Sequence, residues 1–187
     1  MSHGMELEPP RAAAPPDNAV VAAATALLNK LNHGLMMVSM VALVLTAFVL
    51  TYSVVSRYFF HAPTDWQDEA SVFMLVGVTF FCTAYVQSQR GHIGIEALAT
   101  LLPPRVNAAR LFMVDLVSAL FCAFFSWKSW TLFHEAWVDG QTTSSTFAPP
   151  LWIPYAMMAA GMTILTLQIV LQTLARMTNK SSSERPA

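Results

Sequence analysis

The sequence predicts an all-α integral membrane protein with four transmembrane helices and a short amphipathic helix along the inner leaflet. Of its 187 residues, 55% are hydrophobic and only 11% are charged, about half the charged share of a soluble domain. Three long stretches lack Asp, Glu, Lys and Arg altogether. The basic residues gather on one side of these stretches. Together, these observations indicate a chain that crosses a bilayer several times.

The charge-free stretches place three spans, because about 20 helical residues cross a hydrocarbon core of ~30 Å. A fourth span is apolar except for Asp115 and is flanked by Arg110 and Lys128, whose long side chains can reach the interfaces. Lipid offers no hydrogen-bond partners to backbone N–H and C=O groups, so we expect every span to be helical. In chain order the four spans are expected at about residues 31–57, 68–90, 107–130 and 151–175.

The spans form one membrane domain, residues 31–176, between two tails at 1–30 and 177–187. Within the first tail, Ala19–Asn32 is expected to be a helical lead-in to the first span. Small residues within the spans, such as Gly77 and Gly161, are expected to let helices pack closely.

The distribution of Lys and Arg predicts the orientation, because cytoplasmic segments carry an excess of them. With the N-terminus in the cytoplasm, the inner segments hold eight and the outer segments hold only Arg57 and Lys128. Both termini are therefore expected in the cytoplasm, as in a multi-pass protein of the inner membrane.

The first outer loop carries the signals of a helix start. Thr64 and Gln67 fit a capping box, and Asp68 and Glu69 follow where the helix dipole favours carboxylates. Arg57 lies at the end of the preceding span, where a cation is favoured. We favour helix capping as the main role of this loop; the alternative is a charged outer surface for a partner.

The inner loop predicts the amphipathic helix, at about residues 94–102. Ile95, Leu98 and Leu102 recur at helical spacing, and prolines at 103 and 104 end the segment. Such a helix is fit to lie along the phospholipid of the inner leaflet. A plain amphipathic linker would have the same pattern.

In the last outer loop, the five hydroxyl residues at 142–146 could coordinate a ligand, but we expect them mainly to bond nearby backbone groups.

The same sequence argues against several functions. A net charge of −1 with no basic stripe is unlike a nucleic-acid binder. The scattered histidines give no metal or haem pair, and no motif of a catalytic nucleophile or phosphate loop is present. Asp115, an acid within a span, leaves open an independent small channel or transporter. A membrane redox or enzyme subunit is a second alternative, while an accessory or scaffold subunit fits best.

Several short motifs carry a family resemblance, and they occur in this order: Arg57 followed by Trp66-Gln-Asp-Glu69, then Arg90-Gly-His-Ile-Gly-Ile-Glu96, then Gly140, Ser145 and Pro150-Leu-Trp-Ile-Pro154. With the four-span layout, the chain resembles the small membrane subunit, the DctQ-like component, of a tripartite ATP-independent periplasmic (TRAP) transporter. Gly94 departs from the basic residue often found there, which puts a phosphate contact at that position in doubt.

The resemblance implies a scaffold role without enzymatic activity or a cofactor. Its partners would be a large, many-span subunit that carries substrate and sodium ions, and a periplasmic binding protein that delivers an organic acid. The implied candidates for docking the binding protein or structuring the loops are Arg57, Trp66, Asp68, Glu69, Ser145 and Trp152.

Overall fold

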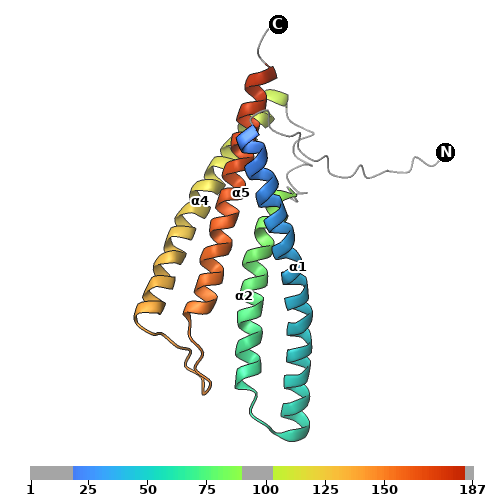
Figure 1. Cartoon of the computed structure of the whole chain (residues 1–187), viewed down its shortest axis with the longest axis vertical. Coiled ribbons are helices and arrows are strands. Elements are labelled where there is room, and N and C mark those ends of the chain that lie inside the picture. Colours follow the sequence, from blue (N-terminus) through green and yellow to red (C-terminus); the bar gives the residue numbers. More distant parts are fainter. Residues whose placement is uncertain (1–18, 90–102, 184–187) are drawn as a thin grey trace, which may run out of the picture.

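The computed structural model of the protein describes residues 19–89 and 103–183. Most of these residues are helical (Figure 1), in α1 (Ala19–Val55), the π-helical turn η1 (Ser56–Phe60), α2 (Asp65–Ser88), α4 (Pro104–Val138) and α5 (Trp152–Ser183). In the described part, β-type pairing is limited to an isolated bridge between Thr142 and Pro150. Four helical segments are long and apolar enough to cross a membrane, which confirms the predicted all-α fold with four spans.

The first helix is much longer than a bilayer requires. α1 has 37 residues, or ~55 Å at 1.5 Å per residue. It begins at Ala19, so the expected lead-in is helical and continuous with the first span. The expected amphipathic helix at residues 94–102, with Ile95, Leu98 and Leu102, lies outside the described residues.

The four helices lie side by side in the order α4, α5, α2, α1 (Figure 1). α5 packs against both α4 and α2, and α2 packs against α1. α1 also contacts α5, near the end where α1 begins and α5 ends. From this end the helices diverge toward the α1–α2 turn and the α4–α5 loop. We call that second side of the molecule the loop end.

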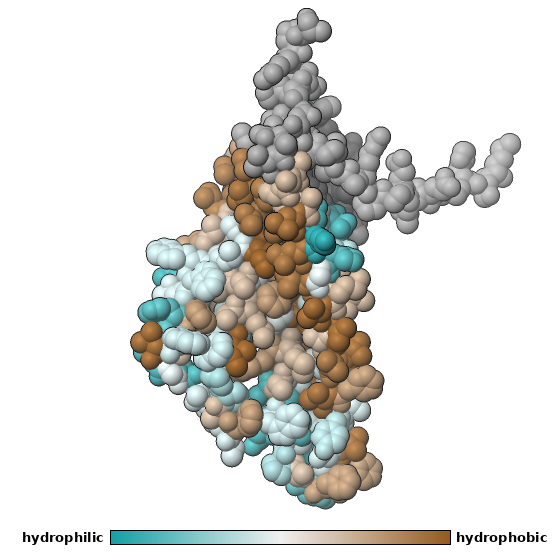
Figure 2. Space-filling model, in the orientation of Figure 1, coloured by the Kyte–Doolittle hydropathy of each residue, from teal (hydrophilic) through white to brown (hydrophobic). Residues whose placement is uncertain are grey.

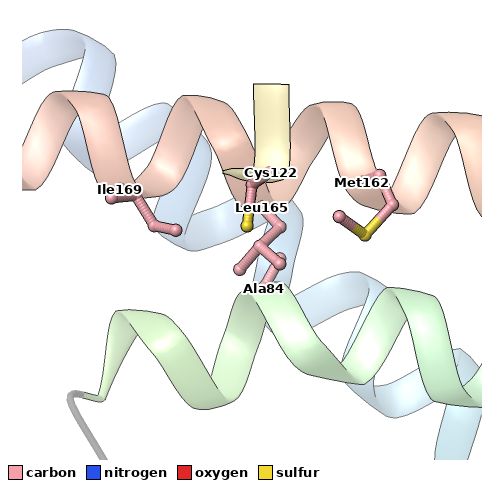
Figure 3. Packing of buried hydrophobic residues seen from close by; sticks show 5 residues of the cluster. All are labelled: Ala84, Cys122, Met162, Leu165 and Ile169. Atoms are coloured by element: carbon pink, nitrogen blue, oxygen red, sulfur yellow. The ribbon is translucent and has the colours of Figure 1, made fainter. Parts of the chain in front are cut away.

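A buried apolar cluster is centred on α5. Met162, Leu165 and Ile169 lie along one side of this helix and meet Ala84 of α2 and Cys122 of α4 (Figure 3). The cluster is small because many of the large apolar side chains face outward, as Figure 2 shows along one face of the helices. Such a surface suits a lipid environment and contacts with other membrane helices.

α5 approaches α2 closely at Gly161. A Cβ atom placed on Gly161 would lie 2.7 Å from Cβ of Phe80 and 2.9 Å from its carbonyl carbon and oxygen. Gly77 of α2 lies opposite Met157, whose sulfur would be 3.0 Å from an added Cβ. These contacts confirm the expectation that small residues permit close packing. Only the Gly161 contact is against backbone, which cannot move aside as a methionine can.

We therefore expect the same substitution to act in opposite directions at two glycines. Gly161→Ala forces α5 away from the Phe80 backbone, and overpacking of this kind costs roughly 1–3 kcal/mol. Gly34→Ala meets no atom within 4 Å and gains helix propensity of about 1 kcal/mol. Thermal unfolding of the protein in mild detergent should show a lower midpoint for Gly161→Ala and an equal or higher one for Gly34→Ala. Equal shifts in the two variants would contradict this account.

Candidate functional site

The first turn of α2 is the point where the two loops of the loop end are joined. Asp68 and Glu69 are adjacent there, and their side chains bond in different directions. Asp68 bonds to the end of α1, whereas Glu69 bonds to the α4–α5 loop. These two carboxylates connect three parts of the chain at one place.

Arg57 is the centre of the first set of bonds. Its Nη2 donates to Asp68 Oδ2 and to Thr64 Oγ1, both at 2.7 Å, and its Nε donates to Thr64 at 3.2 Å. The second oxygen of Asp68 accepts from the buried Ser53 hydroxyl of α1 at 2.9 Å. The Arg57 and Asp68 side chains are 62% and 48% exposed, so the ion pair itself adds only about 0–1 kcal/mol. Its main effect is to fix the direction of the α1–α2 turn.

The prediction of a capping box at the start of α2 is wrong, because neither of its two hydrogen bonds is formed. Thr64 is the N-cap residue of α2, but its side chain makes no capping bond. Its hydroxyl instead accepts from Arg57, because the turn places the end of α1 beside the start of α2. The reciprocal bond is also missing, since the buried Gln67 Oε1 has no partner among the described residues.

The second set of bonds holds the α4–α5 loop. Thr143 donates to Glu69 Oε1 at 2.6 Å and lies 3.2 Å from the Ser145 hydroxyl. Ser145 in turn accepts from the backbone N–H of Ala148 at 3.1 Å. Two backbone bonds, Thr143 N–H to Pro149 and Leu151 N–H to Gln141, close the loop into a narrow hairpin. The hydroxyl run thus bonds both to local backbone, as expected, and to a distant carboxylate.

The other predicted site residues take no part in these hydrogen bonds. Trp66 is on the first turn of α2 and is 49% exposed. Trp152 packs at the start of α5 against Trp137 of α4, with ring centroids 4.9 Å apart. Asp115 is half-buried on α4 and has an interaction partner.

Sequence reasoning missed a group of polar contacts between the helices. Asn32 of α1 donates to Gln168 of α5 at 3.0 Å, and both side chains are almost fully buried. Gln172 of α5 exchanges bonds with Gln87 of α2 at 3.1–3.2 Å. The sequence feature that could have indicated these contacts is an amide side chain within an apolar stretch. Such a residue shows that a polar partner is needed, but it does not identify the partner.

The polar contacts continue between α4 and α5. The hydroxyls of Ser126 and Thr163 are 2.9 Å apart, and the Trp130 indole N–H donates to Thr163 at 3.0 Å. Across the described ranges, 19–89 and 103–183, no group of three or more His, Cys, Asp or Glu side chains could hold a metal ion. The arrangement can brace helices and present a shaped surface.

The Glu69–Thr143 bond should be measurable as an energetic coupling. A bond to a charged group is worth roughly 1.5–3 kcal/mol, so the losses in Glu69→Ala and Thr143→Val should be less than additive in the double variant. Thermal unfolding of the two single variants and the double variant gives this coupling. The matched pair Glu69→Ala with Thr142→Val should be additive, because Thr142 is the exposed neighbour. If the losses of stability were additive in both double variants, the Glu69–Thr143 bond would not hold the loop.

Comparison with known proteins agrees with the fold and the motifs. Residues 46–179 match the family described as "Tripartite ATP-independent periplasmic transporters, DctQ component". The chain is also 26% identical to the C4-dicarboxylate TRAP transporter small permease protein DctQ of Vibrio cholerae serotype O1. That alignment covers 65% of this chain and 62% of the relative. No solved structure matches the chain.

The family match covers well over half of the chain and includes parts of all four apolar helices. The family is a transporter component and not an enzyme. The chain therefore belongs to the DctQ family of TRAP transporter components, as a small multi-pass subunit in the bacterial inner membrane.

Proposed function

We propose that this chain is the static scaffold subunit of a TRAP-type secondary transporter. It pairs with a large, many-span subunit that binds the substrate and sodium ions and moves against the scaffold. A periplasmic binding protein delivers the cargo, an organic acid, and the sodium gradient drives import. The relative from Vibrio cholerae has C4-dicarboxylate in its name, so a C4-dicarboxylate is the first cargo to test.

The observation that carries the proposal is the cross-bracing of the helices. Each pair of neighbouring helices in the row α4, α5, α2, α1 shares at least one side-chain hydrogen bond, and Glu69 ties the α4–α5 loop to α2. The bonds are Ser126–Thr163, Gln87–Gln172, Ser53–Asp68 and Glu69–Thr143. Bonds within the spans, such as Ser126–Thr163, resist sliding of helices in lipid, because a freed group would have no water to bond. This favours a part that stays fixed over a part that moves.

In the proposed orientation both termini lie in the cytoplasm, and the loop end faces the periplasm. The loop end is then the side that meets the binding protein. The segment 94–102 would lie along the phospholipid of the inner leaflet and brace the scaffold there. These assignments rest on the eight inner and two outer basic residues of the sequence.

The bonds at the loop end divide the docking candidates into two groups. Arg57, Asp68, Glu69 and Ser145 bond within the chain, so we assign them to shaping the loops. Trp66 is half exposed on the same turn of α2, and exposed tryptophans are frequent hot spots of interfaces. We therefore assign the main contact with the binding protein to Trp66, presented by the ordered junction beneath it.

Reconstitution tests the proposal directly. The chain is purified with its large subunit and placed in proteoliposomes with an inward sodium gradient, and uptake of a labelled C4-dicarboxylate is measured with added binding protein. Uptake should require both membrane subunits, the binding protein and sodium. Trp66→Ala should raise the binding-protein concentration for half-maximal uptake about tenfold or more, as expected for a hot spot.

The matched control is Trp127→Ala, which removes a more exposed tryptophan from α4 (66% against 49% for Trp66) and should leave that concentration unchanged. If the large subunit transports at the full rate without this chain, the scaffold role is wrong. If the chain alone transports and Asp115→Asn stops it, the protein is an independent channel or transporter instead.

A further inference from the structure

The end of α1 has an unusual backbone. The helix continues into the π-helical turn Ser56–Phe60 and stops at His61, which has a positive φ of 53°. π-helical turns and left-handed non-glycine residues are both uncommon and gather at functional sites. The turn leaves Ser56 buried, whereas Tyr58, Phe59 and Phe60 are 68–76% exposed. Three consecutive aromatic rings are thus presented where the first span reaches the membrane surface, the level that aromatic side chains prefer.

An open concavity of about 630 Å³ lies at this turn, lined by Val54, Arg57, Tyr58 and His61. Its lining combines a permanent cation, a phenol and an imidazole with one apolar side chain. Thr64 and Asp68 accept from Nε and Nη2 of Arg57, and no described residue accepts from Nη1. The guanidinium is therefore already oriented and keeps donors for an oxygen-rich anion. The imidazole of His61 is attached by a short side chain to a backbone in the left-handed region.

A continuous apolar stripe of α1 leads into the concavity. Leu43, Ala47, Leu50 and Val54 follow one another at intervals of four and three residues, which places them on one face of the helix. All four are exposed, and together they extend ~17 Å along the axis. Acyl chains can lie against such a stripe while a charged headgroup occupies the concavity above it.

We infer that this concavity binds the phosphate of a phospholipid headgroup, with the acyl chains of the same lipid along the stripe of α1. Arg57 pairs with the phosphate, and Tyr58 and His61 donate hydrogen bonds to its oxygens. The lipid, rather than a soluble phosphate, is the source because Val54 links the donors to the apolar stripe. The site is on the leaflet next to the α1–α2 turn.

The test uses the full chain, purified from its native membrane and delipidated in mild detergent. Native mass spectrometry follows retention of phosphatidylglycerol, of diacylglycerol with the same acyl chains, and of glycerol phosphate. We expect one tightly held phosphatidylglycerol per chain and no comparable retention of the other two. Tyr58→Phe combined with His61→Asn should weaken retention about tenfold, since two hydrogen bonds are lost. Asparagine tolerates the left-handed backbone at position 61.

Tyr52→Phe is the matched control, because Tyr52 is another exposed tyrosine of α1 outside the concavity. It should retain the lipid as the unchanged chain does. Thermal unfolding without lipid confirms that each variant is folded. Equal retention by the Tyr58/His61 variant in its folded state would overturn the inference, as would equal retention of diacylglycerol. Displacement of the lipid by glycerol phosphate at similar concentration would assign the site to a soluble phosphate.

Discussion

The approach of Gly161 to the backbone of Phe80 sets the distance between α5 and α2, and the positions of the other helices follow from it. In lipid, helices gain little by burying apolar side chains against one another, so close backbone contact and polar bonds must hold them together. α5 is also the helix on which α4 packs, and through Gln168 it reaches Asn32 of α1. A change in the spacing of α5 and α2 would therefore shift both outer helices, α4 and α1.

The loop end depends on the same spacing. Glu69 is on α2, whereas Thr143 is in the loop that leads into α5. Their bond exists only because α2 and α5 are held at a fixed separation further along. Asp68, one residue away, holds the end of α1 through Arg57 and Ser53. Through Asp68 and Glu69, the start of α2 thus holds both loops in positions that depend on how the spans pack.

Much of the fold could be predicted because the bilayer imposes it. The length of a span follows from the hydrocarbon thickness, and polar backbone in lipid must be helical. Small residues such as Gly161 could also be predicted as packing points. The capping box failed because Arg57 competes for the Thr64 hydroxyl, and that competition depends on how two helix ends meet in space. The Asn32–Gln168 bond joins residues 136 positions apart, and no local pattern gives such a pairing.

The row order of the helices has a consequence for synthesis at the ribosome. α1 and α2 can pair as soon as they leave the translocon, but α4 packs against α5, which follows it in the chain. Until α5 is inserted, α4 is a lone helix surrounded by lipid, and the Gly161 face that joins the two halves does not yet exist. Assembly of these four helices therefore requires α5, and a chain that stops before α5 is a helical hairpin beside an unattached helix.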